Sequence, residues 1–247
     1  MALGANFSCA LTGGGGVKCW GRNGQYQLGN GSSSSSTAPE NVSGLSSGVT
    51  SLTAGANHAC AVVSGGAAKC WGYNAYNQLG DGTTSPRSVP TPVSGLSSGV
   101  VSISAGSYHG CAVTSSGGAK CWGYNGAGQL GDSSNSQRAS PVNVAGLTTG
   151  VLSVSSGGQH TCAVLSDRAM KCWGYNQFGQ LGDGTATTRN SPVSVLGLTN
   201  VAMAAGGAGH TCAVTSSGAA KCWGSNSEGR LGDGTGASRS APVNVLP

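Results

Sequence analysis

The chain has 247 residues, of which only 8% are Asp, Glu, Lys or Arg, and 45 residues are glycine. Soluble domains usually contain about 25% charged residues and about 7% glycine, so turns and short strands are expected here in place of helices. The net charge of +5 is not gathered into a basic run, and no stretch approaches the roughly 18 apolar residues of a membrane span. These features argue against nucleic-acid binding and against a membrane span.

Five similar segments of about fifty residues make up the whole chain. The string Cys-Trp-Gly marks each segment and begins at Cys19, Cys70, Cys121, Cys172 and Cys222. Such a period is typical of propellers and solenoids, whose units stack because each is too small to bury its own apolar surface. We expect one propeller domain over residues 1–247, with repeats at about 1–44, 45–95, 96–146, 147–197 and 198–247.

The third repeat shows the strands that each unit should contain. Strands are expected at about 99–106, 111–114 and 119–123, then a short fourth strand around Gln129–Gly131, a long loop at 132–139 and an extended segment at 141–144. Four short strands in about fifty residues are typical of one β-propeller blade. The predicted fold class is therefore all-β, either a closed ring of five blades or an arc of a larger propeller.

Ten cysteines form five pairs with a constant separation of ten residues: Cys9 and Cys19, Cys60 and Cys70, Cys111 and Cys121, Cys162 and Cys172, and Cys212 and Cys222. A turn between the partners predicts a β-hairpin in which Cys111 lies opposite Cys121. Opposed residues have Cα atoms about 4.5–5.5 Å apart, which is within disulfide range, so five disulfides are predicted. Reduced buried thiols and a metal site are the alternatives, although zinc prefers closer spacing and four converging ligands.

Residues that recur at one place in every repeat are interpreted as structural. An aspartate precedes an arginine by six residues in four repeats, and both are missing from the first repeat, which predicts an ion pair that either braces the long loop or reaches the next blade. The four histidines share one position with Phe7, which indicates a packed wall residue, and the tryptophans are expected in the core between blades. No catalytic residue, cofactor or metal is predicted, because a single active site should break the repeat symmetry.

Function is expected where the repeats differ, chiefly in the loop after Trp-Gly. Tyrosine and arginine are enriched at binding hot spots, so a row of them on one rim would contact a partner. The candidate partner-binding residues are Arg22, Tyr26, Tyr73, Tyr76, Tyr108, Tyr124, Tyr175, Phe178, Glu228 and Arg230. The alternative interpretation is that some of these rings only cover loop backbone.

The recurring pattern His-x-Cys-Ala-Val, followed by Lys-Cys-Trp-Gly-x-Asn-x-x-x-Gln-Leu-Gly-Asp-Gly-Thr and an arginine shortly before Pro-Val, resembles the repeat of the regulator of chromosome condensation family. The resemblance covers essentially the whole chain and implies a propeller, which in this family usually has seven blades. The cysteine-paired form is similar to exported bacterial members. It implies a non-catalytic module that binds another protein, as a bacterial β-lactamase inhibitory relative does through loop aromatics on one face.

Two other functions stay open at this point. One is a guanine-nucleotide exchange factor for a small GTPase, against which the cysteine pairs and the lack of an inserted wedge loop argue. The other is a carbohydrate-binding lectin that uses tyrosines as stacking platforms. The expected partner is thus a protein, with carbohydrate as the alternative.

Disulfides form in oxidising compartments, so an extracellular or periplasmic location is expected. No signal peptide is visible, and the first residues match the interior of a later repeat. This start within a repeat suggests a processed protein, an excised domain or a gene fragment.

Overall fold

The computed structural model describes residues 1–246, which form five antiparallel sheets of four strands each. The first sheet contains β1 (Ala2–Leu3), β2 (Phe7–Leu11), β3 (Val17–Gly21) and β4 (Ser36–Asn41), and the second contains β5 (Val49–Ala54), β6 (His58–Val63), β7 (Ala67–Gly72) and β8 (Arg87–Pro92). The third contains β9 (Val100–Ala105), β10 (His109–Thr114), β11 (Ala119–Gly123) and β12 (Arg138–Asn143). The fourth contains β13 (Val151–Ser156), β14 (His160–Leu165), β15 (Met170–Gly174) and β16 (Arg189–Ser194), and the fifth contains β17 (Val201–Gly206), β18 (His210–Thr215), β19 (Ala220–Gly224) and β20 (Arg239–Asn244).

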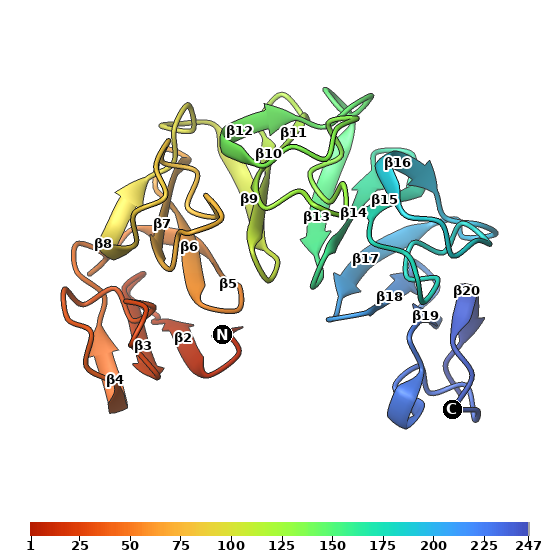
Figure 1. Cartoon of the computed structure of the whole chain (residues 1–247), viewed down its shortest axis with the longest axis horizontal. Coiled ribbons are helices and arrows are strands. Elements are labelled where there is room, and N and C mark those ends of the chain that lie inside the picture. Colours follow the sequence, from red (N-terminus) through yellow and green to blue (C-terminus); the bar gives the residue numbers. More distant parts are fainter. Residues whose placement is uncertain (247) are drawn as a thin grey trace.

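The sheets follow one another along an arc, with the first and fifth sheets at its two ends (Figure 1). Strands pair in chain order within each sheet, so the first strand of each lies on the inner side of the arc and the fourth on the outer side. This arrangement confirms the predicted all-β fold of four-stranded blades. The one helical element in the described residues is a 3-10 turn, η1 (Ser227–Gly229), and no helix there is long and apolar enough to cross a bilayer.

The fourth strand of each blade lies further along the chain than the sequence predicted. The prediction of a strand around Gln129–Gly131 is wrong, because this segment forms tight turns, and the strand is β12 instead. The side-chain oxygen of Asn125 accepts a hydrogen bond from the Leu130 amide at 2.9 Å, and Gly128 and Gly131 both adopt positive φ angles of 74° and 69°. Local side-chain-to-backbone bonding of this kind competes with strand pairing.

The predicted hairpin register between β10 and β11 is confirmed residue by residue. Cys111 pairs with Cys121, Ala112 with Lys120 and Val113 with Ala119. The Cα atoms of Cys111 and Cys121 lie 4.1 Å apart, and all five cysteine pairs are disulfide-bonded. Because the disulfides join neighbouring strands of one sheet, each stabilises its own blade and none links two blades.

The apolar core is divided into four clusters, each of which lies between two successive sheets. The tryptophan on the third strand of one blade is completely buried against the preceding blade in the second to fifth sheets. Trp122, for example, donates its indole N–H to the carbonyl oxygen of Gln78 at 3.0 Å. The prediction that these rings form the core between blades is therefore confirmed for four of the five. Trp20, on the first sheet, is only half-buried.

The histidines form a row along the inner part of the arc. His58, His109 and His160 are 0% exposed, which confirms the interpretation of this position as a packed wall for three of the four histidines. His210, in the fifth sheet, is only half-buried. The ring Nε2 of His109 lies 2.9 Å from the Thr161 hydroxyl, and this hydroxyl donates to the carbonyl oxygen of Gln129. The hydroxyl proton is thus already engaged, so His109 must donate its Nε2–H, which leaves Nδ1 unprotonated and without a partner.

Candidate functional site

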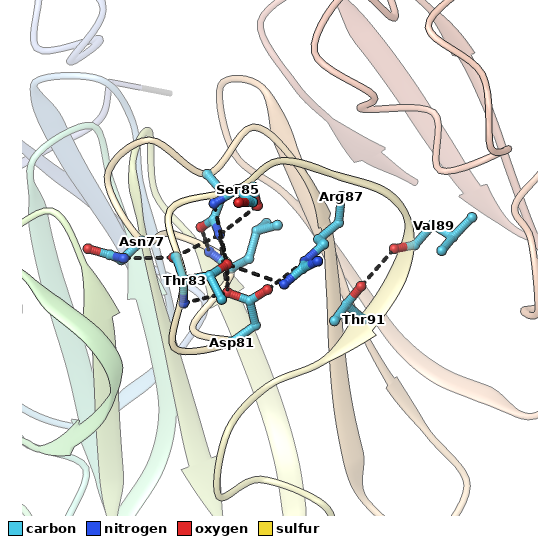
Figure 2. A network of polar contacts seen from close by, with 9 residues as sticks. Asn77, Asp81, Thr83, Ser85, Arg87, Val89 and Thr91 are labelled. Atoms are coloured by element: carbon cyan, nitrogen blue, oxygen red, sulfur yellow. Dashed lines mark hydrogen bonds and ion pairs between the residues drawn. The ribbon is translucent and has the colours of Figure 1, made fainter.

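The loop between the third and fourth strands of each blade is held by one buried asparagine. In the second blade, Asn74 donates to the Asp81 carboxylate and to the carbonyl oxygens of Thr83 and Ser85, and accepts a bond from the Leu79 amide. Figure 2 shows this network around Asp81 and Thr83. The same bonds recur around Asn125, Asn176 and Asn226, so the loops share one rigid base on which different side chains are presented.

An ion pair completes the base of the loop. Arg87 Nε lies 2.7 Å from Asp81 Oδ2, and the equivalent pair is present in the third, fourth and fifth blades. The predicted carboxylate–guanidinium brace is confirmed, and it joins the loop to the first residue of the fourth strand of the same blade, not to the next blade. Burial raises the pKa of Asp81, but hydrogen bonds from Arg87 and Thr83 outweigh that effect and hold this pKa below its usual value.

We expect the substitution Asp81→Asn to lower the free energy of unfolding by about 1.5–3 kcal/mol, the usual range for hydrogen bonds to a charged group. The second substitution Arg87→Ser, made together with it, reproduces the natural Asn30 and Ser36 of the first repeat. Because the Arg87 side chain is 35% exposed, the coupling between the two changes should be about 0.5–1 kcal/mol. Urea unfolding of both single variants and the double variant measures this coupling, and strictly additive losses would contradict the brace.

The loop between the first two strands of each blade lies on the same side of the arc as the asparagine-based loop. The two are joined by a backbone hydrogen bond, which in the third blade runs from the Tyr124 amide to the Tyr108 carbonyl oxygen at 2.9 Å. We call the side formed by these two sets of loops the loop face. The short hairpins between the second and third strands, such as Ser115–Gly118, lie on the opposite side because the strands are antiparallel.

Four tyrosines meet on the loop face and form what we call the tyrosine cluster: Tyr73, Tyr76, Tyr108 and Tyr124. The ring of Tyr76 is at the centre, with ring centroids 6.1 Å from Tyr73, 5.1 Å from Tyr108 and 5.4 Å from Tyr124. Tyr76 is 38% exposed, whereas the three rings around it are half-buried. The cluster joins the second and third blades and presents one aromatic ring to solvent.

A second aromatic contact lies further along the loop face. Tyr175 and Phe178 of the fourth blade have ring centroids 6.2 Å apart in an edge-on arrangement, and Phe178 is 48% exposed. Phe178 occupies the loop position of Tyr76, while the third blade has the buried Ala127 there. The aromatic surface is therefore interrupted between the tyrosine cluster and this pair.

Arg22 belongs to the surroundings of the tyrosine cluster. A pocket of about 230 Å³ is lined by Arg22, Gln25, Asn57, Tyr73, Tyr76 and Tyr108. Asn57 was not among the candidates from the sequence, although it occupies the same loop position as Tyr108, and Gln25 occupies that of Tyr76. Comparing the repeats at these two variable positions would have found both.

The remaining candidates lie apart from the cluster. Tyr26 is half-buried, with a positive φ of 63°, and its amide donates to the Asn23 carbonyl oxygen. Glu228 and Arg230 are exposed in the fifth blade, where the Arg230 guanidinium bonds to the carbonyl and hydroxyl oxygens of Ser227. Within residues 1–246, no three His, Cys, Asp or Glu side chains converge as metal ligands would.

The family model for the RCC1-like domain matches residues 1–246. Among curated proteins, the ultraviolet-B receptor UVR8 of Arabidopsis thaliana is 34% identical over 198 residues, which are 79% of this chain and 45% of UVR8. The probable E3 ubiquitin-protein ligase HERC4 of Mus musculus is 36% identical over 203 residues, which are 80% of this chain and 19% of HERC4. The chain thus spans less than half the length of these relatives.

Solved structures with the same fold extend this similarity. The crystal structure of human WBSCR16 superposes with a TM-score of 0.87 at 25% identity, covering 99% of this chain and 66% of that one. Prp20p from Saccharomyces cerevisiae also superposes with a TM-score of 0.87, at 23% identity, covering 98% of this chain and 62% of that one. Both cover almost all five blades of this chain.

Proposed function

Because this chain belongs to the RCC1-like domain family, we propose that it is a non-catalytic module that binds a partner protein through the aromatic side chains of its loop face. The tyrosine cluster is the observation that carries this proposal. Aromatic rings supply large contact area at low conformational cost and are enriched at the centres of protein interfaces. Tyr76 is held by three neighbouring rings and still exposes 38% of its surface, so it can make contact without reordering.

The family fold supports a role in binding proteins. The structure of Prp20p is described together with its binding properties to Gsp1p and histones. In the present chain, the loop face combines rigid loop bases with side chains that differ from blade to blade, as a surface built for one particular partner requires. The opposite side carries short hairpins of Ser, Gly and Thr residues in most repeats, which offer few anchors.

We also propose that the protein works outside the cytoplasm. Five disulfides are consistent with an oxidising environment, because thiols are kept reduced in the cytosol. A titration of the unfolded, unreduced protein should find no free thiols. Finding ten reactive thiols would contradict the proposed location.

Replacing Tyr76 by alanine is expected to reduce partner capture sharply. Hot-spot truncations cost about 2 kcal/mol or more, which weakens binding about thirtyfold. The immobilised protein would be exposed to the proteins secreted by the source organism, and the retained proteins quantified by mass spectrometry. The variant Tyr76→Phe keeps the ring and should retain most of the binding.

Arg168 supplies the control on the opposite side of the arc, since it is exposed in the hairpin between β14 and β15. The variant Arg168→Gln should capture the same proteins as the wild type. Equal capture by the wild type, Tyr76→Ala and Arg168→Gln would show that the loop face is not the binding surface.

A further inference from the structure

The pocket beside the tyrosine cluster joins three blades. Arg22 comes from the first blade, Tyr73 and Tyr76 from the second, and Tyr108 from the third, and the volume between them is about 230 Å³. Two of its lining residues, Gln25 and Asn57, are held by Gln27, which is 0% exposed. The Gln27 side chain accepts a hydrogen bond from the Gln25 amide at 2.8 Å and donates to Asn57 Oδ1 at 3.5 Å. The pocket is therefore a built feature of the fold.

Arg22 differs from the four arginines that form ion pairs, because no carboxylate in the described part of the chain balances its charge. The four ion pairs within residues 1–246 each join an arginine of the loop base to its own aspartate, and Arg22 belongs to none of them. Arg230, at the far end of the face, is bonded to its own loop through Ser227. Arg22 is exposed and brings a positive charge to the pocket without a carboxylate to balance it.

The other side chains that line the pocket are uncharged and can each donate a hydrogen bond. The phenol groups of Tyr73, Tyr76 and Tyr108 can each donate one bond, and Asn57 has its amide nitrogen available because its oxygen faces Gln27. No Asp or Glu lines the pocket. A site with one guanidinium, several neutral donors and no anion is complementary to a ligand that carries a single negative charge.

We infer that this pocket accepts an Asp or Glu side chain of the partner protein, with the carboxylate on Arg22 and the tyrosine rings around its methylene groups. The inference rests on the proposed function, since it supplies the chemistry of the residue that the partner inserts. A carboxylate matches the charge of one guanidinium and its paired N–H donors. Tyr76 then acts as the apolar anchor and Arg22 as the group that selects an acidic residue over an uncharged one.

A defined probe tests the pocket without the partner. N-acetylglutamate N-methylamide would be titrated into the isotope-labelled full chain, with N-acetylglutamine N-methylamide as the uncharged probe, and binding followed by NMR. We expect saturable shifts of the Arg22 and Tyr76 signals with the glutamate probe, and binding at least about tenfold weaker with the glutamine probe, a loss equivalent to about 1.4 kcal/mol. The substitution Arg22→Gln should remove this preference, and Arg168→Gln should leave it unchanged.

Each outcome of this titration decides the inference. No saturable shift by the glutamate probe, equal binding of both probes, or unchanged preference in Arg22→Gln would overturn it. The proposed function is decided separately by partner capture. If capture depends on Tyr76 but is unaffected by Arg22→Gln, the loop face binds a protein and the acidic residue is excluded.

Discussion

Lowering the pH from 7 to 4 is expected to remove about 3 kcal/mol of stability for each completely buried histidine. Burial lowers the pKa of His58 and His160 to about 4. Burial, together with repulsion from His160 and His58, lowers that of His109 to about 3. In the unfolded chain these histidines bind protons below about pH 6.5, the ordinary histidine pKa. In the folded chain they stay neutral down to about pH 4. Stability is therefore fully present above pH 6.5 and falls as the pH approaches 4.

The hydrogen bonds of the histidine row explain why the charged form is excluded. His109 already donates its Nε2–H to Thr161, and the second proton would have to sit on Nδ1, which is buried without a partner. An unpaired buried donor with a charge carries a large free-energy penalty. The charged ring would also lie close to the neighbouring histidines. The same geometry recurs between His160 and the Thr211 hydroxyl, 2.8 Å apart.

Urea unfolding between pH 7.5 and pH 4 measures this effect. Each histidine contributes a slope of about 1.4 kcal/mol per pH unit between the two pKa values. His58→Phe is the sharpest test, because neither ring nitrogen of His58 has a partner and the first repeat carries phenylalanine at this position. The slope should fall by the contribution of one histidine, about 1.4 kcal/mol per pH unit, in this variant. If the free energy of unfolding stays constant down to pH 4 and falls only below it, the acid sensitivity comes from the carboxylates and not from the histidines.

The parts of the fold that depend only on neighbouring residues, such as the register of each hairpin, could be predicted from the sequence. The ten-residue separation around a turn places Cys111 opposite Cys121 in any regular hairpin, so the register needed no information from other repeats. The short fourth strand was misplaced for the opposite reason. Leu130 is completely buried in the manner of a strand residue, yet its amide is bound by Asn125, and the Gln129 carbonyl oxygen accepts the indole N–H of Trp173 from the next blade.

The individual residues of the tyrosine cluster could be predicted from the sequence, but their contacts with one another could not. The loop positions that vary between repeats include Tyr73, Tyr76 and Tyr108, so these residues could be selected one by one. Tyr76 and Tyr108 belong to different loops of successive blades, and their rings meet only because the blades stack. The same stacking brings Arg22 to the pocket. Such neighbours are set by the angle between blades, which no local pattern records.

The substitution Trp122→Ala should lower the free energy of unfolding by about 3–5 kcal/mol, the usual cost of removing a buried large aromatic side chain. The indole is 0% exposed and lies in the cluster between the second and third sheets. A Cβ placed on Gly80 or Gly110 would lie 2.7 Å or 2.6 Å from the indole, so the surrounding backbone is shaped to this ring. The backbone has little freedom to collapse into the space that alanine leaves, and the Gln78 carbonyl oxygen loses its donor.

Trp20 supplies a matched comparison within the same chain. It occupies the same position of its blade but is half-buried, because the first sheet lies at the end of the arc. Trp20→Ala should cost only about 1–2 kcal/mol, in proportion to the smaller apolar area that it removes from water. Urea unfolding followed by circular dichroism compares both variants without depending on tryptophan fluorescence. Equal losses would mean that tryptophan stabilises its own blade, whereas the expected difference assigns most of its contribution to the packing of one blade against the next.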